Sequence, residues 1–186
     1  MNTITVKDAI LTAAAELGFA DTVQAYFDGS SQEGEAEVEA LLRCFQLVEN
    51  ELALDYLPLY AEEEVETGTG VVPYDAFSRA IVRIVKVTDE WGNDAPFTLF
   101  PEYLKTQGGK CKIRYAYAPE KKELDGESDY HLYVSARLLA YGMAMEYALA
   151  RGMFEEASVW DKKYKDAITA TYRANPCRVI RSRRWV

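Results

Sequence analysis

The sequence predicts an α+β, mainly α-helical protein: a helical bundle with an inserted small antiparallel β-sheet and an extended C-terminal arm. Apolar residues recur at steps of three and four near both ends of the chain, whereas the middle alternates in polarity and is rich in β-branched residues. With 49% hydrophobic and 27% charged residues among 186, the composition is that of a globular protein with one core. We expect one helical domain over residues 1–174, a β insertion at about 60–118, and the arm over 175–186.

Two helices are expected before the first loop. Thr5 and Asp8 match a capping box, and Gly18 is placed to end the first helix. The apolar face of this helix comprises Val6, Ala9, Ile10, Ala13 and Ala14. A short second helix is expected around residues 21–27, before a polar loop at 28–34.

A longer third helix is expected from Glu35 to Leu57. Pro58 ends it, because proline lacks the amide hydrogen that would continue the helical hydrogen bonds. The apolar positions recur at helical spacing and are Val38, Leu41, Leu42, Phe45, Val48, Leu52 and Tyr56. This spacing indicates an amphipathic helix packed on the core.

The middle of the chain predicts three or four antiparallel strands. The segments at 79–89 and 110–119 read as strands, the first because it is rich in β-branched residues and the second because it alternates. On the second, one face carries Cys111, Ile113, Tyr115 and Tyr117, and the other carries Lys112, Arg114 and Ala116. Residues 97–100 and 60–67 are further short strand candidates. The glycines at 68–70 and 108–109 lack the spacing of a phosphate-binding loop and predict turns.

Two helices forming a hairpin are expected at the C-terminal end of the domain. The first has an apolar seam that comprises Tyr130, Val134, Leu138, Tyr141, Met145 and Leu149. Ala140, Ala144 and Ala148 form a stripe of small residues beside the seam, which favours a close helix contact. The second helix follows Gly152, ends before Pro176, and has its apolar face at Ala157, Trp160, Tyr164, Ala167, Ile168 and Thr171.

Composition narrows the cellular setting. The net charge of −9 argues against duplex DNA binding by the body of the protein, which would need a basic face. Cys44, Cys111 and Cys177 match neither a disulfide framework nor a zinc pattern, which fits a reducing compartment. The N-terminal residues lack a signal-peptide pattern, and no apolar run reaches bilayer length, so neither secretion nor membrane insertion is expected.

Catalytic signals are scarce. His131 is the only histidine, and Asp129 could orient it as a base, but no nucleophile motif accompanies them. The alternative for His131 is a solvent-exposed residue at a helix N-terminus. Cys44 and Cys111 fall on apolar faces, where thiols act as small hydrophobic groups. We therefore expect no catalytic residues, no metal site and no cofactor.

An acidic run and a basic arm remain. The run contains Glu62, Glu63, Glu64 and Glu66, whose alternation along a strand favours a solvated edge over a cation site. The arm, NPCRVIRSRRWV, has no acidic residue and includes Arg178, Ile180, Arg181, Arg183, Arg184 and Trp185. Such a segment suits β-strand addition to a partner, with arginine and tryptophan as anchors. The arm could instead fold back on the acidic body, or be a frayed end.

The order of these segments resembles that of head–tail connector (adaptor, or neck) proteins of tailed bacteriophages. The resemblance rests on VENELALDYLPLY, YDAFSRAIVRIVKVTDEWGN, KCKIRYAYAPE and the helical stretch YHLYVSARLLAYGMAMEYALARGMFEEASVWDKKYKDAI, and it covers most of residues 36–174. It is carried by a helical bundle with a β insertion, a strand ending in Ala-Pro, and a G-x-x-E-x-A-x-x-W pattern from Gly152 to Trp160.

The resemblance implies a structural virion protein without catalytic residues. It implies a homo-oligomeric ring that binds the portal protein, partly through C-terminal arms, as well as neck and tail completion proteins. The ring would leave a channel for DNA, which the chain would meet only transiently and without sequence specificity. Its expected location is the head–tail interface of the virion, with the host cytoplasm during assembly. In this setting Glu62, Glu63, Glu64 and Glu66 become candidates for the channel wall, where like charge would let DNA pass.

Two alternatives belong to other classes. An acidic protein-binding or DNA-mimic regulatory module would use the same negative surface, but as a monomer or dimer. A small helical-bundle enzyme would need a pocket that contains His131 or clustered carboxylates. Oligomeric state separates the connector from the regulatory module, and a His131→Ala variant tests the enzyme.

Overall fold

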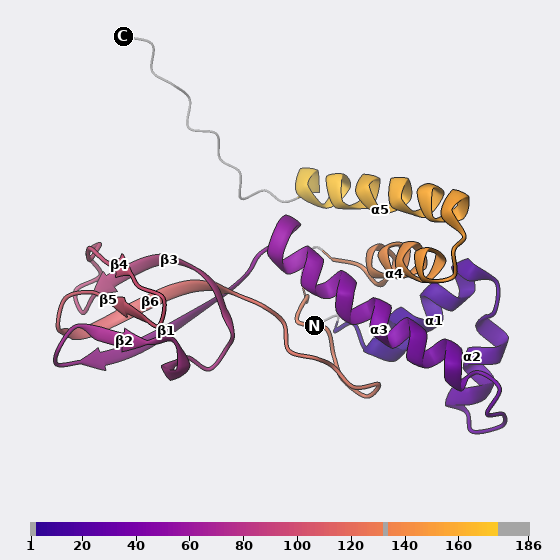
Figure 1. Ribbon diagram of the computed structural model, residues 1–186, viewed down its shortest axis with the longest axis horizontal. Coiled ribbons are helices and arrows are strands. Elements are labelled where there is room, and N and C mark those ends of the chain that lie inside the picture. Colours follow the sequence, from indigo (N-terminus) through magenta and orange to yellow (C-terminus); the bar gives the residue numbers. More distant parts are fainter. Residues whose placement is uncertain (1–2, 132–133, 175–186) are drawn as a thin grey trace, which may run out of the picture. The chain divides into compact units, whose positions relative to one another are not determined.

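The computed structural model describes residues 3–131 and 134–174, which form five α-helices and two three-stranded antiparallel sheets (Figure 1). The α+β, mainly α prediction is confirmed, with 47% helix and 22% strand. The chain divides into two compact units. The helical unit comprises Met1–Glu49 and Lys122–Val186, and the β unit comprises Asn50–Lys121.

The first two helices agree with the sequence prediction. Helix α1 spans Val6–Leu17, and the Thr5 side chain caps it by accepting a hydrogen bond from the Asp8 amide at 3.0 Å. Gly18 ends α1 in the left-handed conformation with φ of 87°. The five predicted apolar positions of α1 are all buried. Helix α2 spans Ala20–Phe27.

Helix α3 is shorter than predicted. It spans Glu35–Glu51 and is followed by a π-helical turn, η1, over Leu52–Tyr56. The amide of Leu57 bonds to the carbonyl of Leu52, five residues back. Proline restricts the residue before it to extended backbone, and Leu57 has φ of −126° and ψ of 73°. Pro58 therefore disturbs the last turn and not only the residue at which the helix stops.

Helices α4 (Ala136–Ala150) and α5 (Phe154–Ala174) pack side by side as the predicted hairpin (Figure 1). Gly152 turns the chain with φ of 74°. Helix α4 begins later than expected, because Ser135 caps it through the Leu138 amide at 3.2 Å. The predicted stripe of small residues is confirmed, because Ala140, Ala144 and Ala148 are all buried. The predicted seam is wrong at Leu149, which is 43% exposed.

The β unit contains two sheets, whereas one sheet of three or four strands was expected. The larger sheet has the order β1-β6-β3, with β1 at Leu59–Thr67, β6 at Gly109–Tyr117 and β3 at Ile81–Asp89. The smaller has the order β2-β5-β4, formed by Val71–Pro73, Tyr103–Lys105 and Thr98–Leu99. A 3₁₀ turn, η2, spans Tyr74–Ala76. Strands β2 and β5 have three residues each, too few to show a period in the sequence.

Strand β3 buries every third residue, which is unusual because side chains alternate along a regular strand. Its register against β6 shifts between Ile81 and Arg83 and again between Ile84 and Lys86. At each shift β3 has one more residue than its partner, as at a β-bulge. Ile84 and Val87 are thereby buried in the core of the β unit, while a pair of residues is exposed after each inward-facing isoleucine: Val82 with Arg83, and Val85 with Lys86.

A buried carboxylate holds the segment that re-enters the helical unit. Glu49, 1% exposed near the end of α3, accepts hydrogen bonds from the Ser128 hydroxyl at 2.6 Å and the Asp129 amide at 3.0 Å. Lys122 bonds the Asp129 carboxylate at 2.9 Å, and the Gln46 side chain bonds the Lys122 carbonyl at 3.0 Å. Because Glu49 and Lys122 are the residues at which the chain leaves and rejoins the helical unit, these bonds tie the two crossing points together.

We expect Glu49→Ala to destabilise the helical unit by about 1–3 kcal/mol, because it leaves two buried donors without an acceptor. Glu49→Gln, the matched control, keeps an acceptor oxygen. Burial raises the pKa of Glu49, so its contribution to stability is complete below the unfolded value of 4.5 and is lost as pH rises through the folded value. In urea unfolding, the stability of Glu49→Gln relative to that of the wild type should therefore increase from pH 4 to pH 7. A constant difference across this range would contradict the assignment.

Candidate functional site

The C-terminal arm lies outside the described residues. Helix α5 ends at Ala174, directly before it. The predicted partner-binding residues Arg178, Ile180, Arg181, Arg183, Arg184 and Trp185, together with Cys177, all belong to this segment. Their role stays a prediction.

The four candidate channel glutamates lie on β1, but on two different faces. Glu62, Glu64 and Glu66 are exposed on the outer face of the larger sheet. Glu63 is half-buried on the opposite face, toward the side chains of the β-unit core. The alternation predicted from the sequence is therefore present, and it separates Glu63 from the other three.

The outer glutamates face a row of cations on β6. Glu62 lies 3.0 Å from Lys112 and 3.9 Å from Arg114, and Glu66 lies 3.9 Å from Lys110. The hydrogen bond from Lys112 lowers the pKa of Glu62, and the same bond raises the pKa of Lys112. This face of the sheet therefore carries paired charges of both signs and is not a uniformly acidic surface.

Glu63 joins the sheet to the segment that follows η2. It accepts hydrogen bonds from the Ser78 hydroxyl at 2.6 Å, from the Ser78 amide at 3.2 Å, and from the hydroxyl of buried Tyr115. Burial opposes ionisation of Glu63, but these hydrogen bonds outweigh it and lower its pKa. Burial also raises the pKa of Tyr115, and its bond to Glu63 adds to the shift. Glu63 therefore has a structural role within the β unit.

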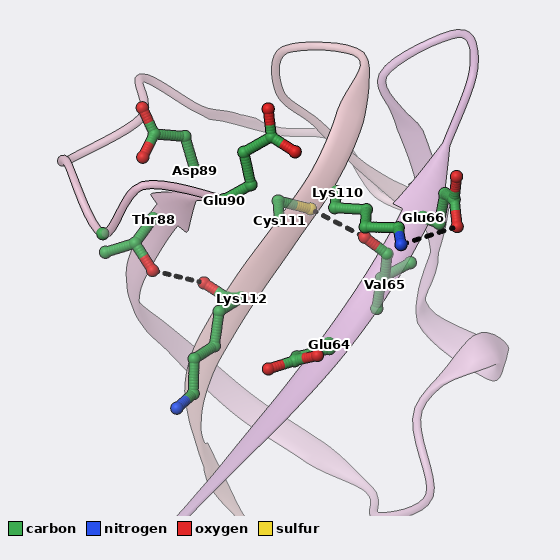
Figure 2. Close-up of a pocket in the computed structure, with 10 residues that line it drawn as sticks. Glu64, Val65, Glu66, Thr88, Asp89, Glu90, Lys110, Cys111 and Lys112 are labelled. Carbon is green, nitrogen blue, oxygen red and sulfur yellow. Dashed lines mark hydrogen bonds and ion pairs between the residues drawn. The ribbon is translucent and has the colours of Figure 1, made fainter.

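A pocket of about 480 Å³ lies at the end of the larger sheet, and it is lined by residues of β1, β3, β6 and the turn after β3. Figure 2 shows how these residues lie. Glu64, Glu66, Glu90, Lys110 and Lys112 bring both charge signs to its walls. The carboxylate of Asp89 is directed into its own turn, where it accepts hydrogen bonds from the backbone amides of Trp91 at 3.0 Å and Asn93 at 2.8 Å. The pocket is open and its lining is mixed in charge. The residues that line it do not form a recognisable set of catalytic groups.

The thiol in this pocket is not activated. Cys111 is buried and donates to the Val65 carbonyl at 3.4 Å (Figure 2), and burial raises its pKa. Burial likewise raises the pKa of Cys44 to about 11. Both thiols are therefore protonated at neutral pH and are poor nucleophiles. Among the described residues, no group of three or more His, Cys, Asp or Glu could hold a metal ion.

His131 is exposed and precedes α4 by several residues, so its expected position at a helix N-terminus is wrong. Helix α4 begins at Ala136, after the cap at Ser135. The Asp129 carboxylate, expected as a possible partner of His131, is bonded to Lys122 at 2.9 Å. Asp129 thus belongs to the buried contacts around Glu49.

Sequence reasoning missed the exposed apolar side chains that accompany charges on two elements. Val82 and Val85 are exposed on β3, and Phe154 and Val159 are exposed on α5. The signal for the first pair was present as the repeat Ile-Val-Arg-Ile-Val-Lys, whose period of three indicates two residues facing solvent for each one facing the core. No comparable periodic signal marks the second pair.

Among the described residues, no helix is long and apolar enough to cross a bilayer. Comparison with known proteins identifies no family: no protein-family model matches the sequence, and no curated protein matches it.

Proposed function

We propose that this protein is a non-enzymatic head–tail connector of a tailed bacteriophage, which assembles as a ring between the portal and the tail. The observation that carries the proposal is the position of the basic arm. Residues 175–186 contain four arginines, one tryptophan and no acid, and they follow α5 of the helical hairpin directly. A helical hairpin that leads into a basic, aromatic-tipped segment is suited to docking on another protein.

The proposed partners are the portal protein, through the arm, and neck or tail completion proteins elsewhere on the ring. The order of a helical unit, a β insertion and a helical hairpin supports this reading, because it is the order that the resemblance to connectors requires. DNA would pass through the ring without being held. The ion pairs of Glu62 and Glu66 make the outer face of β1 and β6 a poor phosphate-binding surface, since several cations there already face carboxylates.

The same ion pairs give less support to the alternative, an acidic DNA-mimic or protein-binding module. Such a module would present carboxylates without neighbouring cations, so that a basic partner could pair with them. On β1, Glu62 lies beside Lys112 and Arg114. The alternative is therefore ranked second, and it predicts a monomer or dimer.

Removal of residues 177–186 tests the proposal. We expect the truncated chain to fold with an unchanged unfolding midpoint and to lose at least a hundredfold in affinity for the cognate portal, measured by native mass spectrometry and titration calorimetry. Trp185→Ala alone should cost about 2 kcal/mol of binding free energy if it fills a partner pocket. Higher salt should weaken the arginine contacts more than the tryptophan contact, because salt screens exposed charges.

The matched control is a chain of full length in which the four arm arginines are replaced by lysine. Lysine keeps the charge but not the planar, bidentate geometry, so binding should weaken without being abolished. If truncation instead unfolds the protein, or if the truncated chain binds the portal as well as the wild type does, docking through the arm is ruled out.

A further inference from the structure

Two exposed patches of opposite charge lie on different units of the chain. The β3 patch comprises Val82, Arg83, Val85 and Lys86, and the α5 patch comprises Phe154, Glu155, Glu156 and Val159. Each pairs two exposed apolar side chains with two like charges. From this complementarity we infer that the β3 patch of one copy binds the α5 patch of a second copy, which deepens the ring proposed above and rests on it.

The β3 patch results from the irregular register of its strand. Because β3 has two register shifts against β6, valine and cation are exposed together twice in succession. Val82 is 44% exposed and Val85 is 42% exposed. Lys86 lies 2.7 Å from Asp94, whereas Arg83 forms no ion pair with any described residue. The patch therefore keeps at least one cation available for a partner carboxylate.

The α5 patch lies at the first turns of its helix. Phe154 is 71% exposed and Val159 is 57% exposed, and both lie close in sequence to Glu155 and Glu156. Neither glutamate forms an ion pair within the part of the chain that the structure describes. Acids in a first turn also complement the helix dipole. The dipole, however, gives no reason for a large aromatic side chain to be exposed beside them, whereas an interface does.

The two patches are different surfaces, so their contact is heterologous. A heterologous contact repeats from copy to copy and closes into a ring when the rotation permits. Apolar side chains would supply burial, and the Arg83 and Lys86 charges would fix the orientation against Glu155 and Glu156. The second copy is favoured over other partners because both complementary surfaces are present in this one sequence.

The test measures self-association by sedimentation velocity and native mass spectrometry at low ionic strength. Arg83→Glu with Lys86→Glu should weaken association at least tenfold, and Glu155→Lys with Glu156→Lys should do the same. Each double variant retains one intact patch. The two reversed patches are also complementary to each other, so an equimolar mixture of the two variants should regain association, with the two variants alternating in the assembly, whereas each variant alone stays weakened. All four reversals in one chain should restore association, because the charges are exchanged.

The control is Lys105→Glu with Lys121→Glu, an equal charge change at exposed positions of the same unit, which should leave association unchanged. Thermal unfolding checks that every variant remains folded. A wild-type chain that stays monomeric at its highest soluble concentration overturns the inference, as does a mixture in which the two variants do not associate. Portal binding is measured separately with the chain truncated at residue 176. Loss of portal binding with intact self-association, or the reverse, shows which of the two proposals has failed.

Discussion

Replacing Gly142 by leucine is expected to destabilise the helical unit by about 3 kcal/mol or more, even though leucine is the better helix former. Gly142 lies in α4 where α3 and α5 both approach it. A Cβ atom at this position would be 2.7 Å from a methyl group of Val48 and 3.0 Å from the ring of Tyr164. A leucine side chain has no space there without separating the helices, so the cost of overpacking exceeds the gain of about 1 kcal/mol in helix propensity.

Two further variants show whether the lost space is the cause. Gly142→Ala adds only the Cβ atom, and its gain in helix propensity should offset most of the clash. Val48→Ala in the Gly142→Leu background removes the nearest methyl groups and should recover part of the stability, so the two effects should not be additive. Urea denaturation measures each variant. A Gly142→Leu protein as stable as the wild type would mean that the three helices are not in close contact at this position.

The helices could be predicted because local chemistry determines them. The Thr5 cap, the left-handed Gly18 and the apolar face of α1 are all where the sequence places them. The alanine stripe of α4 is likewise buried as predicted. The predicted seam was wrong at Leu149 because a helical period assigns residues to a face but does not show how far along that face a neighbouring helix extends. The start of α4 was missed because the Ser135 cap was not recognised.

The β unit was predicted in kind but not in detail. The long strands β3 and β6 have enough residues for a pattern, and they were found. In the smaller sheet, β4 lies within the strand candidate at 97–100, whereas β2 and β5 were missed because each has three residues and their pairing depends on contacts distant in sequence. The shifted register of β3 changes which residues face solvent. The three-residue repeat in the sequence indicates this exposure, and the pairing with β6 shows the register shifts that cause it.

The candidate channel glutamates illustrate what a sequence leaves open about a site. Alternation along β1 predicted that adjacent glutamates would face opposite sides, and Glu63 does face the core. The sequence does not show which strand lies beside β1, however. Because β6 is that strand, Lys110, Lys112 and Arg114 are brought against the outer glutamates. An acidic segment in the sequence thus becomes a surface of mixed charge in the fold.

Leu138→Ala and Leu149→Ala make the same chemical change on the same helix, but we expect very different effects. Leu138 is 2% exposed near the start of α4, so its truncation should leave a cavity and cost about 2–5 kcal/mol. Leu149 is 43% exposed near the end, so its truncation should change stability by no more than about 1 kcal/mol. Both substitutions give alanine within α4, so differences in helix propensity cancel to first order. Chemical denaturation of the two variants under one condition measures the difference directly. Equal losses would place both leucines on one buried seam, as the helical period alone predicts, and would contradict the packing of α4 described above.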